Sequence, residues 1–244
     1  MTDKVTFVLT SCGRKFLLDK VLNSFFKYNT YKFENMFLVE DSINENVYKE
    51  ISDDWGDKIK IICNKNKKGQ IKSIIDTYKK VNTPYIFHCE DDWLYTRPSF
   101  VEESLKILKT DEKIIQVWLE SKKSASRLDI FSYGDLQLID GIKYRKVFCK
   151  EGWEWGHFSF RPGVKRLSDY NLIGGYKKFK NELDISLKYK QLGFYTVIIE
   201  NPAVLDIGDD HHMSDPTRQW PKRRKTNAPK GLKRLWKHIK KFKF

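Results

Sequence analysis

Three consecutive carboxylates, Glu90, Asp91 and Asp92, directly follow a short apolar run over residues 85–89. A run of this length and composition indicates a buried strand. Adjacent carboxylates repel one another, and they are costly to bury unless a positive charge lies between them. At the edge of a sheet, such oxygens would form a site for a hard divalent cation. The alternative is a solvated turn after a strand, with Trp93 as a core anchor.

Through the first ninety residues, short apolar runs alternate with segments whose apolar residues recur at helical spacing. The pattern predicts strands over 5–10, 35–39, 59–63 and 85–89, and helices over 16–28, 47–55 and 70–81. This β-α-β-α-β-α-β order predicts an α/β fold with a mainly parallel sheet flanked by helices. Ligands of such sheets bind beyond the carboxyl ends of the strands. Polar residues follow each of these ends: Thr10, Ser11, Glu40, Asp41, Asn64 and the three carboxylates.

The second half of the chain is more irregular. Its patterns predict helices over 99–108 and 181–191, strands over 114–119 and 195–199, and short strands within 130–149. A loop rich in Gly and Trp follows, with Trp153, Trp155 and His157.

The net charge of +14 is concentrated at the end of the chain. Residues 217–244 hold 12 Lys and Arg and no acidic residue. Subtracting these 12 from the total of 46 leaves 34 basic residues against 32 acidic ones in residues 1–216. We therefore predict a nearly neutral globular domain over 1–216 and a basic tail over 217–244.

The tail has the pattern of an amphipathic helix. Leu232, Leu235, Trp236, Ile239 and Phe242 recur at helical spacing, with basic residues between them. This pattern is typical of helices that lie on an anionic membrane surface. Docking on the protein's own body and binding to nucleic acid are the alternatives. We favour the membrane and expect no nucleic-acid partner.

Cysteine spacing and hydropathy bear on the compartment. The four cysteines are widely spaced without a CxxC pair, which argues against a zinc module and a disulfide framework. The chain begins without a signal-peptide pattern, and no apolar run reaches the length of a spanning helix. We expect a cytoplasmic protein, peripheral at the inner face of a membrane.

The order of these pieces resembles the family 2 glycosyltransferases, which have the nucleotide-sugar-binding GT-A fold. The resemblance covers roughly residues 5–212. It rests on Val8–Ser11 with Arg14, Glu40-Asp41-Ser42, Gly69–Ser73, Glu90-Asp91-Asp92 (resembling the DxD metal motif) and Asn181–Asp184. Lys72 and Ser73 replace the Arg and Asn of the family's Gly-x-x-Arg-Asn segment.

The resemblance implies roles for the residues at these positions. The donor would be bound by Thr10, Ser11, Arg14, Glu40, Asp41, Lys72 and Asp91. Mn²⁺ or Mg²⁺ would be held by Asp92, with Glu90 and either His211 or His212 as further candidates. The ion would neutralise the departing nucleoside diphosphate.

Glu182 is the candidate general base for the acceptor hydroxyl. Asp184 is the second candidate, but at N3 of a helix capped by Asn181 it resembles part of a capping box. We therefore rank Glu182 first. A single catalytic carboxylate acting on an activated donor favours inversion. Trp153, Trp155 and His157 would lie on the acceptor side, because aromatic faces suit sugar rings.

The resulting hypothesis is a metal-dependent inverting glycosyltransferase of polysaccharide biosynthesis. It would move a sugar from a nucleotide-sugar, with a UDP-sugar favoured, to a glycan or lipid-linked acceptor. Two alternatives are a sugar nucleotidylyltransferase of the same fold and a non-enzymatic protein that binds nucleic acid or membrane through its tail. The segment Ser11–Arg14 is too poor in Gly for the first, and the neutral body speaks against the second.

Overall fold

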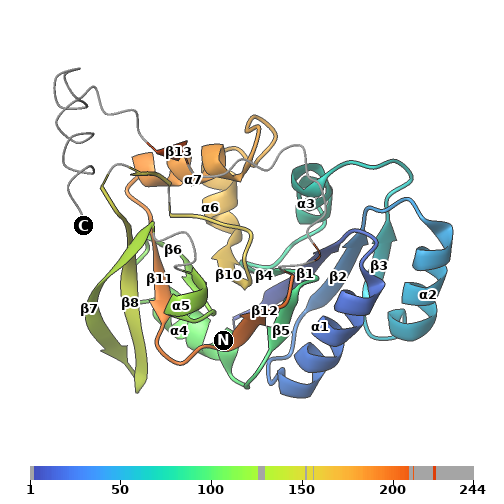
Figure 1. Cartoon of the computed structure of the whole chain (residues 1–244), viewed down its shortest axis with the longest axis horizontal. Coiled ribbons are helices and arrows are strands. Elements are labelled where there is room, and N and C mark those ends of the chain that lie inside the picture. Colours follow the sequence, from blue (N-terminus) through green and yellow to red (C-terminus); the bar gives the residue numbers. More distant parts are fainter. Residues whose placement is uncertain are drawn as a thin grey trace, which may run out of the picture.

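The computed structural model describes residues 3–125, 130–151, 153–155, 157–208, 211 and 222–223. Figure 1 shows a central sheet with helices on both of its faces and a second sheet beside it. The boundary expected at residue 216 and the amphipathic pattern at 232–242 lie outside the described residues.

The main sheet has five strands in the order β10-β4-β1-β2-β3. β4, β1, β2 and β3 run parallel, and β10 is antiparallel to β4. Its strands are β1 (Val5–Ser11), β2 (Asn35–Glu40), β3 (Lys60–Cys63), β4 (Tyr85–Glu90) and β10 (Gly163–Arg166). The parallel β-α-β order predicted from the sequence is confirmed.

Helices cover both faces of this sheet, which explains why β1 is apolar on both sides. Phe7 of β1 packs with Phe25, 4.4 Å between ring centroids, on the side of α1. Val8 belongs to the opposite cluster, with Ile74 of α3. The helices are α1 (Lys15–Tyr28), α2 (Glu45–Trp55), α3 (Gln70–Tyr78), α4 (Phe100–Leu108), α5 (Lys122–Ala125), α6 (Leu167–Leu172) and α7 (Glu182–Gln191).

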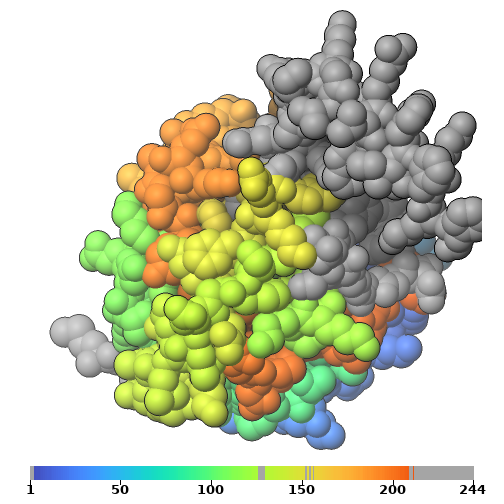
Figure 2. Space-filling model, turned by 60° about the vertical axis from the view of Figure 1, so that its left-hand side comes forward, coloured from blue at the N-terminus to red at the C-terminus, as the bar shows by residue number. Residues whose placement is uncertain are grey.

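The second sheet has the order β6-β11-β8-β7. Its strands are β6 (Ile114–Trp118), β7 (Phe131–Ile139), β8 (Ile142–Cys149) and β11 (Tyr195–Ile199). The β7–β8 hairpin, drawn in yellow-green, forms much of the lower part of the face seen in Figure 2. The two sheets meet where β10 passes β6, since a Cβ at Gly163 would lie 2.6 Å from the carbonyl oxygen of Val117. Only glycine permits this approach.

Two short ribbons complete the fold. β5 (Trp93–Tyr95) pairs antiparallel with β12 (Val204–Asp206), and β9 (Trp153–Glu154) pairs antiparallel with β13 (Lys222–Arg223). β5, β10, β12 and α6 were not predicted. Elements of three to six residues carry too little periodicity to be recognised, and these strands depend on distant partners. No helix within the described ranges is long and apolar enough to cross a bilayer.

Candidate functional site

The carboxyl ends of the four parallel strands lie level with one another. Ser11 is in register with Glu40, and Glu40 with Cys63. Thr10 is in register with Glu90 on the other side of β1. The polar residues that end these strands therefore share one edge of the sheet, as the sequence predicted.

A cation lies between the two aspartates at this edge, and it is the guanidinium of Arg14. Its Nη2 contacts Asp91 Oδ1, and lies 3.0 Å from Asp92 Oδ2. Asp91 is buried and also accepts a hydrogen bond from Ser11 Oγ at 2.8 Å. Burial raises the pKa of Asp91 to about 6, although the charge of Arg14 opposes the rise. Asp91 and Asp92 thus bind one positive group together, because each carboxylate attracts a cation and the cation reduces their mutual repulsion.

Carboxylate oxygens of this kind are ligands that divalent cations take, and here the guanidinium of Arg14 contacts both carboxylates. Asp92 would be the ligand, with Asp91 or Glu90 beside it. Within the described ranges, no group of three His, Cys, Asp or Glu side chains is arranged to hold a metal. Few protein ligands are needed where a diphosphate supplies further oxygens.

Asp92 is held in place by the loop after β12. Ile207 donates its backbone N–H to the carbonyl oxygen of Asp92 at 2.9 Å. A Cβ at Gly208 would lie 2.6 Å from Asp92 Oδ2, so this position has room only for glycine. The backbone oxygen of His211 accepts from Arg14 Nη1 at 3.1 Å, while its ring stands against Phe16, 4.8 Å between centroids. His212 lies outside the described residues.

The two acidic residues at the end of β2, Glu40 and Asp41, hold different parts of the edge. Asp41 Oδ1 accepts from Asn64 Nδ2 at 2.8 Å, and its Oδ2 accepts from the N–H of Gly69 at 2.7 Å. Asp41 thus shapes the loop that leads into α3. Glu40 Oε1 accepts from the N–H groups of Gly13 and Ser42, both at 2.8 Å. The other oxygen of Glu40 is buried and has no hydrogen-bond partner within the described part of the chain.

Lys72 lies in the first turn of α3 and is exposed. No bond from its ammonium to the other donor-side residues is present among the described residues. Its predicted role at a diphosphate stays a prediction.

Glu90 and Glu182 reach the same region from β4 and from the start of α7. Glu90 Oε1 accepts from Gln70 Nε2 at 2.6 Å, and Glu182 Oε2 accepts from the N–H of Phe160 at 2.9 Å. Burial raises the pKa of Glu90, and the charges of Asp92 and Glu182 raise it further. The charge of Glu182 is thus close enough to Glu90 to act on its ionisation.

Asp184 has a structural role at the start of α7. Its N–H donates to Asn181 Oδ1 at 2.9 Å, and its own carboxylate accepts from the N–H of Lys180 at 3.2 Å. This is the capping arrangement predicted from the sequence, with one difference. The carboxylate of Asp184 accepts from the N–H of Lys180, one residue before the N-cap residue Asn181. Asp184 therefore has a structural explanation as a capping residue, and the role of Glu182 as a base stays a prediction.

Sequence reasoning missed a buried lysine in the same region. Lys165 of β10 is 3% exposed, and its Nζ lies 3.4 Å from the carbonyl oxygen of Arg161. Burial lowers its pKa to about 8, against the opposing influence of Glu182 and Glu90. The sequence offered little indication of this burial. Lys165 follows an apolar residue, Val164, but the strand that contains both is only four residues long and was not predicted. Gln70, the partner of Glu90, was missed for a similar reason, because glutamine is ordinary at a helix start.

The expected acceptor side contains one core residue and two half-buried ones. Trp155 is buried and packs in a cluster with Trp118 and Leu183. Leu183 follows Glu182 in α7. This cluster therefore packs the loop that contains Trp153, Trp155 and His157 (the Trp loop) against the helix of the candidate base. Trp153 and His157 are half-buried. Burial lowers the pKa of His157 to about 4, with help from the charges of Lys190 and Lys146, so this histidine is neutral at pH 7.

Comparison with known proteins supports the fold assignment. No protein-family model and no curated protein matches the chain. Among solved structures, it is similar to the mannosyltransferase PcManGT from Pyrobaculum calidifontis in complex with GDP-Man and Mn²⁺. The TM-score is 0.57 at 11% identity, over 83% of this chain and 55% of that one. It is also similar to GalNAc-T7 with UDP, GalNAc and Mn²⁺, with a TM-score of 0.57 at 13% identity, over 82% of this chain and 42% of that one.

Both similar structures are glycosyltransferases of the GT-A type. The chain thus has the GT-A fold, which confirms the fold class implied by the sequence resemblance. It spans about half the length of each of these two proteins.

Proposed function

We propose that the chain is a metal-dependent glycosyltransferase that uses a nucleotide-sugar donor and inverts the anomeric centre. The observation that supports the proposal is the pair Asp91 and Asp92, whose carboxylates contact one cation at the carboxyl edge of a parallel sheet. The charge of Glu182 also acts on Glu90, two residues before Asp92. A sheet-edge cation site beside a separate carboxylate is what transfer from a nucleoside diphosphate requires.

The donor would lie along the carboxyl ends of β1, β2 and β4. Thr10, Ser11 and the acidic pair at the end of β2 would face the nucleoside, with Arg14 and Lys72 near the diphosphate. Mn²⁺ or Mg²⁺, held by Asp92 with Glu90 or Asp91, would supply positive charge for the leaving group. The donor nucleotide is proposed to be UDP.

Glu182 would act on the acceptor. As an acceptor hydroxyl oxygen attacks the anomeric carbon, Glu182 takes its proton, and the bond between that carbon and the diphosphate oxygen breaks. Attack from the side opposite the leaving group inverts the configuration. Trp153 and His157 would border the acceptor, which we propose to be a glycan or a lipid-linked saccharide of polysaccharide biosynthesis.

The experiment is a thermal-shift screen of nucleotide-sugars in the presence of Mn²⁺, followed by transfer assays. Asp92→Ala is expected to abolish the metal dependence of nucleotide binding. Glu182→Gln is expected to keep nucleotide binding and lose transfer, while Asp184→Asn keeps both, because its role is to cap α7. Nucleotide binding that ignores both Mn²⁺ and Asp92 would refute the proposal.

We further propose that the tail over 217–244 holds the protein at the inner face of an anionic membrane. Its basic residues and the recurring apolar positions support this assignment. Replacing Lys237, Lys240 and Lys241 with Glu should weaken binding to phosphatidylglycerol vesicles. Unchanged binding would contradict the tail's role.

A further inference from the structure

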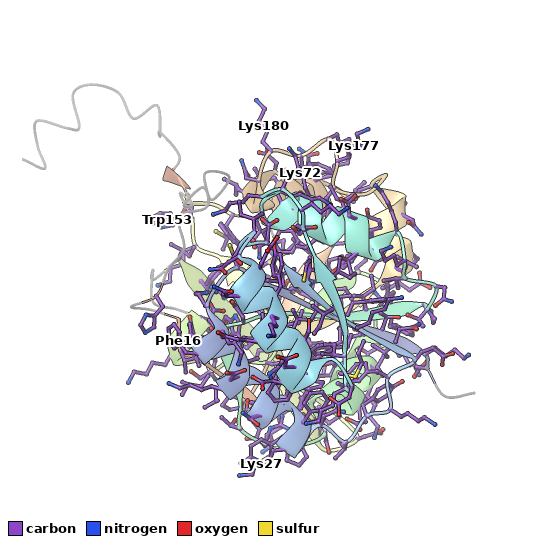
Figure 3. The ribbon with its side chains drawn as sticks, turned by 90° about the vertical axis from the view of Figure 1, so that its right-hand side faces the viewer. Phe16, Lys27, Lys72, Trp153, Lys177 and Lys180 are labelled. Atoms are coloured by element: carbon purple, nitrogen blue, oxygen red, sulfur yellow. The ribbon has the colours of Figure 1, made fainter. Side chains whose placement is uncertain are left out.

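A group of exposed lysines stands at one edge of the folded body, next to the carboxyl ends of the strands. We name it the lysine rim. It consists of Lys65 and Lys67 in the loop before α3, Lys72 in α3, and Lys177, Lys178 and Lys180 in the loop between α6 and α7. Figure 3 shows Lys72, Lys177 and Lys180 together at the upper edge, with Lys27 at the opposite end of the molecule.

The two segments of the rim are neighbours because their helices pack together. Tyr78 of α3 contacts Tyr170 and Tyr176, with ring centroids 5.2 Å and 6.2 Å apart. Ile74 of α3 and Ile173 lie in the same buried cluster. The α6–α7 loop is therefore held on the same side of the molecule as α3, where Figure 3 labels Lys72, Lys177 and Lys180.

The charges of the rim are not neutralised by the body. The acidic residue nearest in sequence to Lys72 is Asp76, and it forms ion pairs with Lys68 and Lys79, neither of which belongs to the rim. Asp184 is occupied with the backbone of Lys180. Among the described residues, none of the six rim lysines lies within ion-pair distance of a carboxylate. Since the body as a whole is nearly neutral, this local excess is not a consequence of overall composition.

Two apolar residues belong to the same stretch of chain as Lys177, Lys178 and Lys180. Leu172, at the end of α6, is 61% exposed, and Phe179 is half-buried between Lys178 and Lys180. An exposed leucine on the same segment as several lysines suits the boundary between lipid headgroups and acyl chains. A single-stranded nucleic acid would instead require exposed aromatic faces for its bases to stack on.

Two residues of the basic tail are described, and they lie on the same side of the molecule. Residues 222–223 form β13, which pairs with β9 in the Trp loop. Figure 1 shows β13 beside α7, on the upper side that also carries the α6–α7 loop.

We propose that the lysine rim, with Leu172, is a docking surface for anionic phospholipid. Docked in this way, the open edge of the sheet faces the bilayer, and the acceptor reaches the site from the membrane. The part about the acceptor rests on the proposed function. The docking itself does not.

The test compares two full-length variants with equal charge change. In the rim variant, Lys177, Lys178 and Lys180 become Glu. In the control variant, Lys20, Lys27 and Lys32, which are exposed on and after α1, become Glu. Co-sedimentation is measured with vesicles of phosphatidylcholine alone and with vesicles containing 30% phosphatidylglycerol, in about 0.15 M salt, where charges farther than about 8 Å from the surface are screened.

Each basic residue close to an anionic leaflet contributes about fivefold to binding. The rim variant is therefore expected to bind the anionic vesicles at least about tenfold more weakly than the unmodified chain, and the control within about twofold. Leu172→Asp should weaken binding more than Leu138→Asp, which alters an equally exposed leucine of β7. Thermal unfolding of every variant confirms that it is folded.

Equal losses in the rim and control variants would overturn the proposal, because binding would then follow total charge. So would unchanged binding by the rim variant, and so would a rim-dependent affinity for a single-stranded oligonucleotide without affinity for vesicles. Binding of a nucleoside diphosphate with Mn²⁺ is measured separately in solution. Its failure would refute the proposed transfer reaction and leave the vesicle result standing.

Discussion

Replacing Arg14 with Met is the most direct perturbation of the site. The guanidinium lies between Asp91 and Asp92 and also binds the backbone of His211. Its removal leaves Asp91, whose side chain is 1% exposed, without its positive partner. Arg14 therefore has a structural role in addition to any contact with a donor.

The expected loss in the free energy of unfolding follows from the burial of the Arg14–Asp91 pair. Removing one partner of a buried ion pair costs about 3–5 kcal/mol. Arg14 retains 13% exposure of its side chain, so we expect a loss near the lower figure, about 3 kcal/mol. For a domain of this size, each kcal/mol corresponds to about 2–4 °C, so the loss is about 6–12 °C in Tm.

The loss should also depend on pH. The charge of Arg14 opposes the effect of burial and so limits the pKa of Asp91, which is about 6. Without Arg14 this pKa rises further, and ionising Asp91 in the folded state becomes costlier. Below pH 6 the carboxyl is protonated in both folded proteins. The difference in stability between unmodified chain and variant must therefore widen as the pH rises through 6.

Mn²⁺ provides the decisive assay. In the unmodified chain, an ion bound at Asp92 would have to displace the guanidinium, whereas in Arg14→Met this competing cation is absent. Mn²⁺ should therefore stabilise Arg14→Met more than the unmodified chain, as measured by the shift in Tm. Binding contributes about 2.7 kcal/mol to the free energy of unfolding at a hundredfold excess of Mn²⁺ over Kd.

Arg97→Met is the matched control, because it breaks a partly buried pair with Glu103 elsewhere in the fold. It should lose stability without any added response to Mn²⁺. If Mn²⁺ stabilises both variants equally, or if Arg14→Met is as stable as the unmodified chain at pH 8, the account of this site is wrong.

Three further predictions concern the surroundings of the site. Gly208→Ala should weaken Mn²⁺-dependent nucleotide binding, measured by calorimetry, because a Cβ there would lie 2.6 Å from Asp92 Oδ2; unchanged affinity would show that Asp92 is not the ligand. Asp41→Ala should lower the free energy of unfolding in urea by about 2–4 kcal/mol, since the N–H of Gly69 and the amide of Asn64 lose their acceptor; a loss under 1 kcal/mol would contradict this role. Glu200→Gln should destabilise the chain most at pH 7 and progressively less as the pH falls through the lowered pKa of Glu200, since the hydrogen bond from Lys122 lowers that pKa and the stabilisation disappears as the carboxylate is protonated; an effect that does not change with pH would refute it.

Much of the fold could be predicted because the first half obeys local rules. β1 is buried on every residue, and α1 and α3 place apolar side chains at helical spacing. From these patterns follow the parallel sheet and the edge at which the polar residues gather. The cap of α7 by Asn181 was also predictable, because capping depends on residues only three positions apart.

What the sequence by itself determined is therefore the order of the elements and the residue types at the strand ends, including Glu90, Asp91 and Asp92. Only the tertiary structure decided what each of them contacts. Arg14 reaches Asp91 across 77 positions of sequence, Glu182 and Lys165 approach Glu90 from strands and helices far along the chain, and the rim lysines meet through the packing of α3. Such pairings are set by how the sheet and helices pack, and side-chain periodicity reports only which face of its own element a residue occupies.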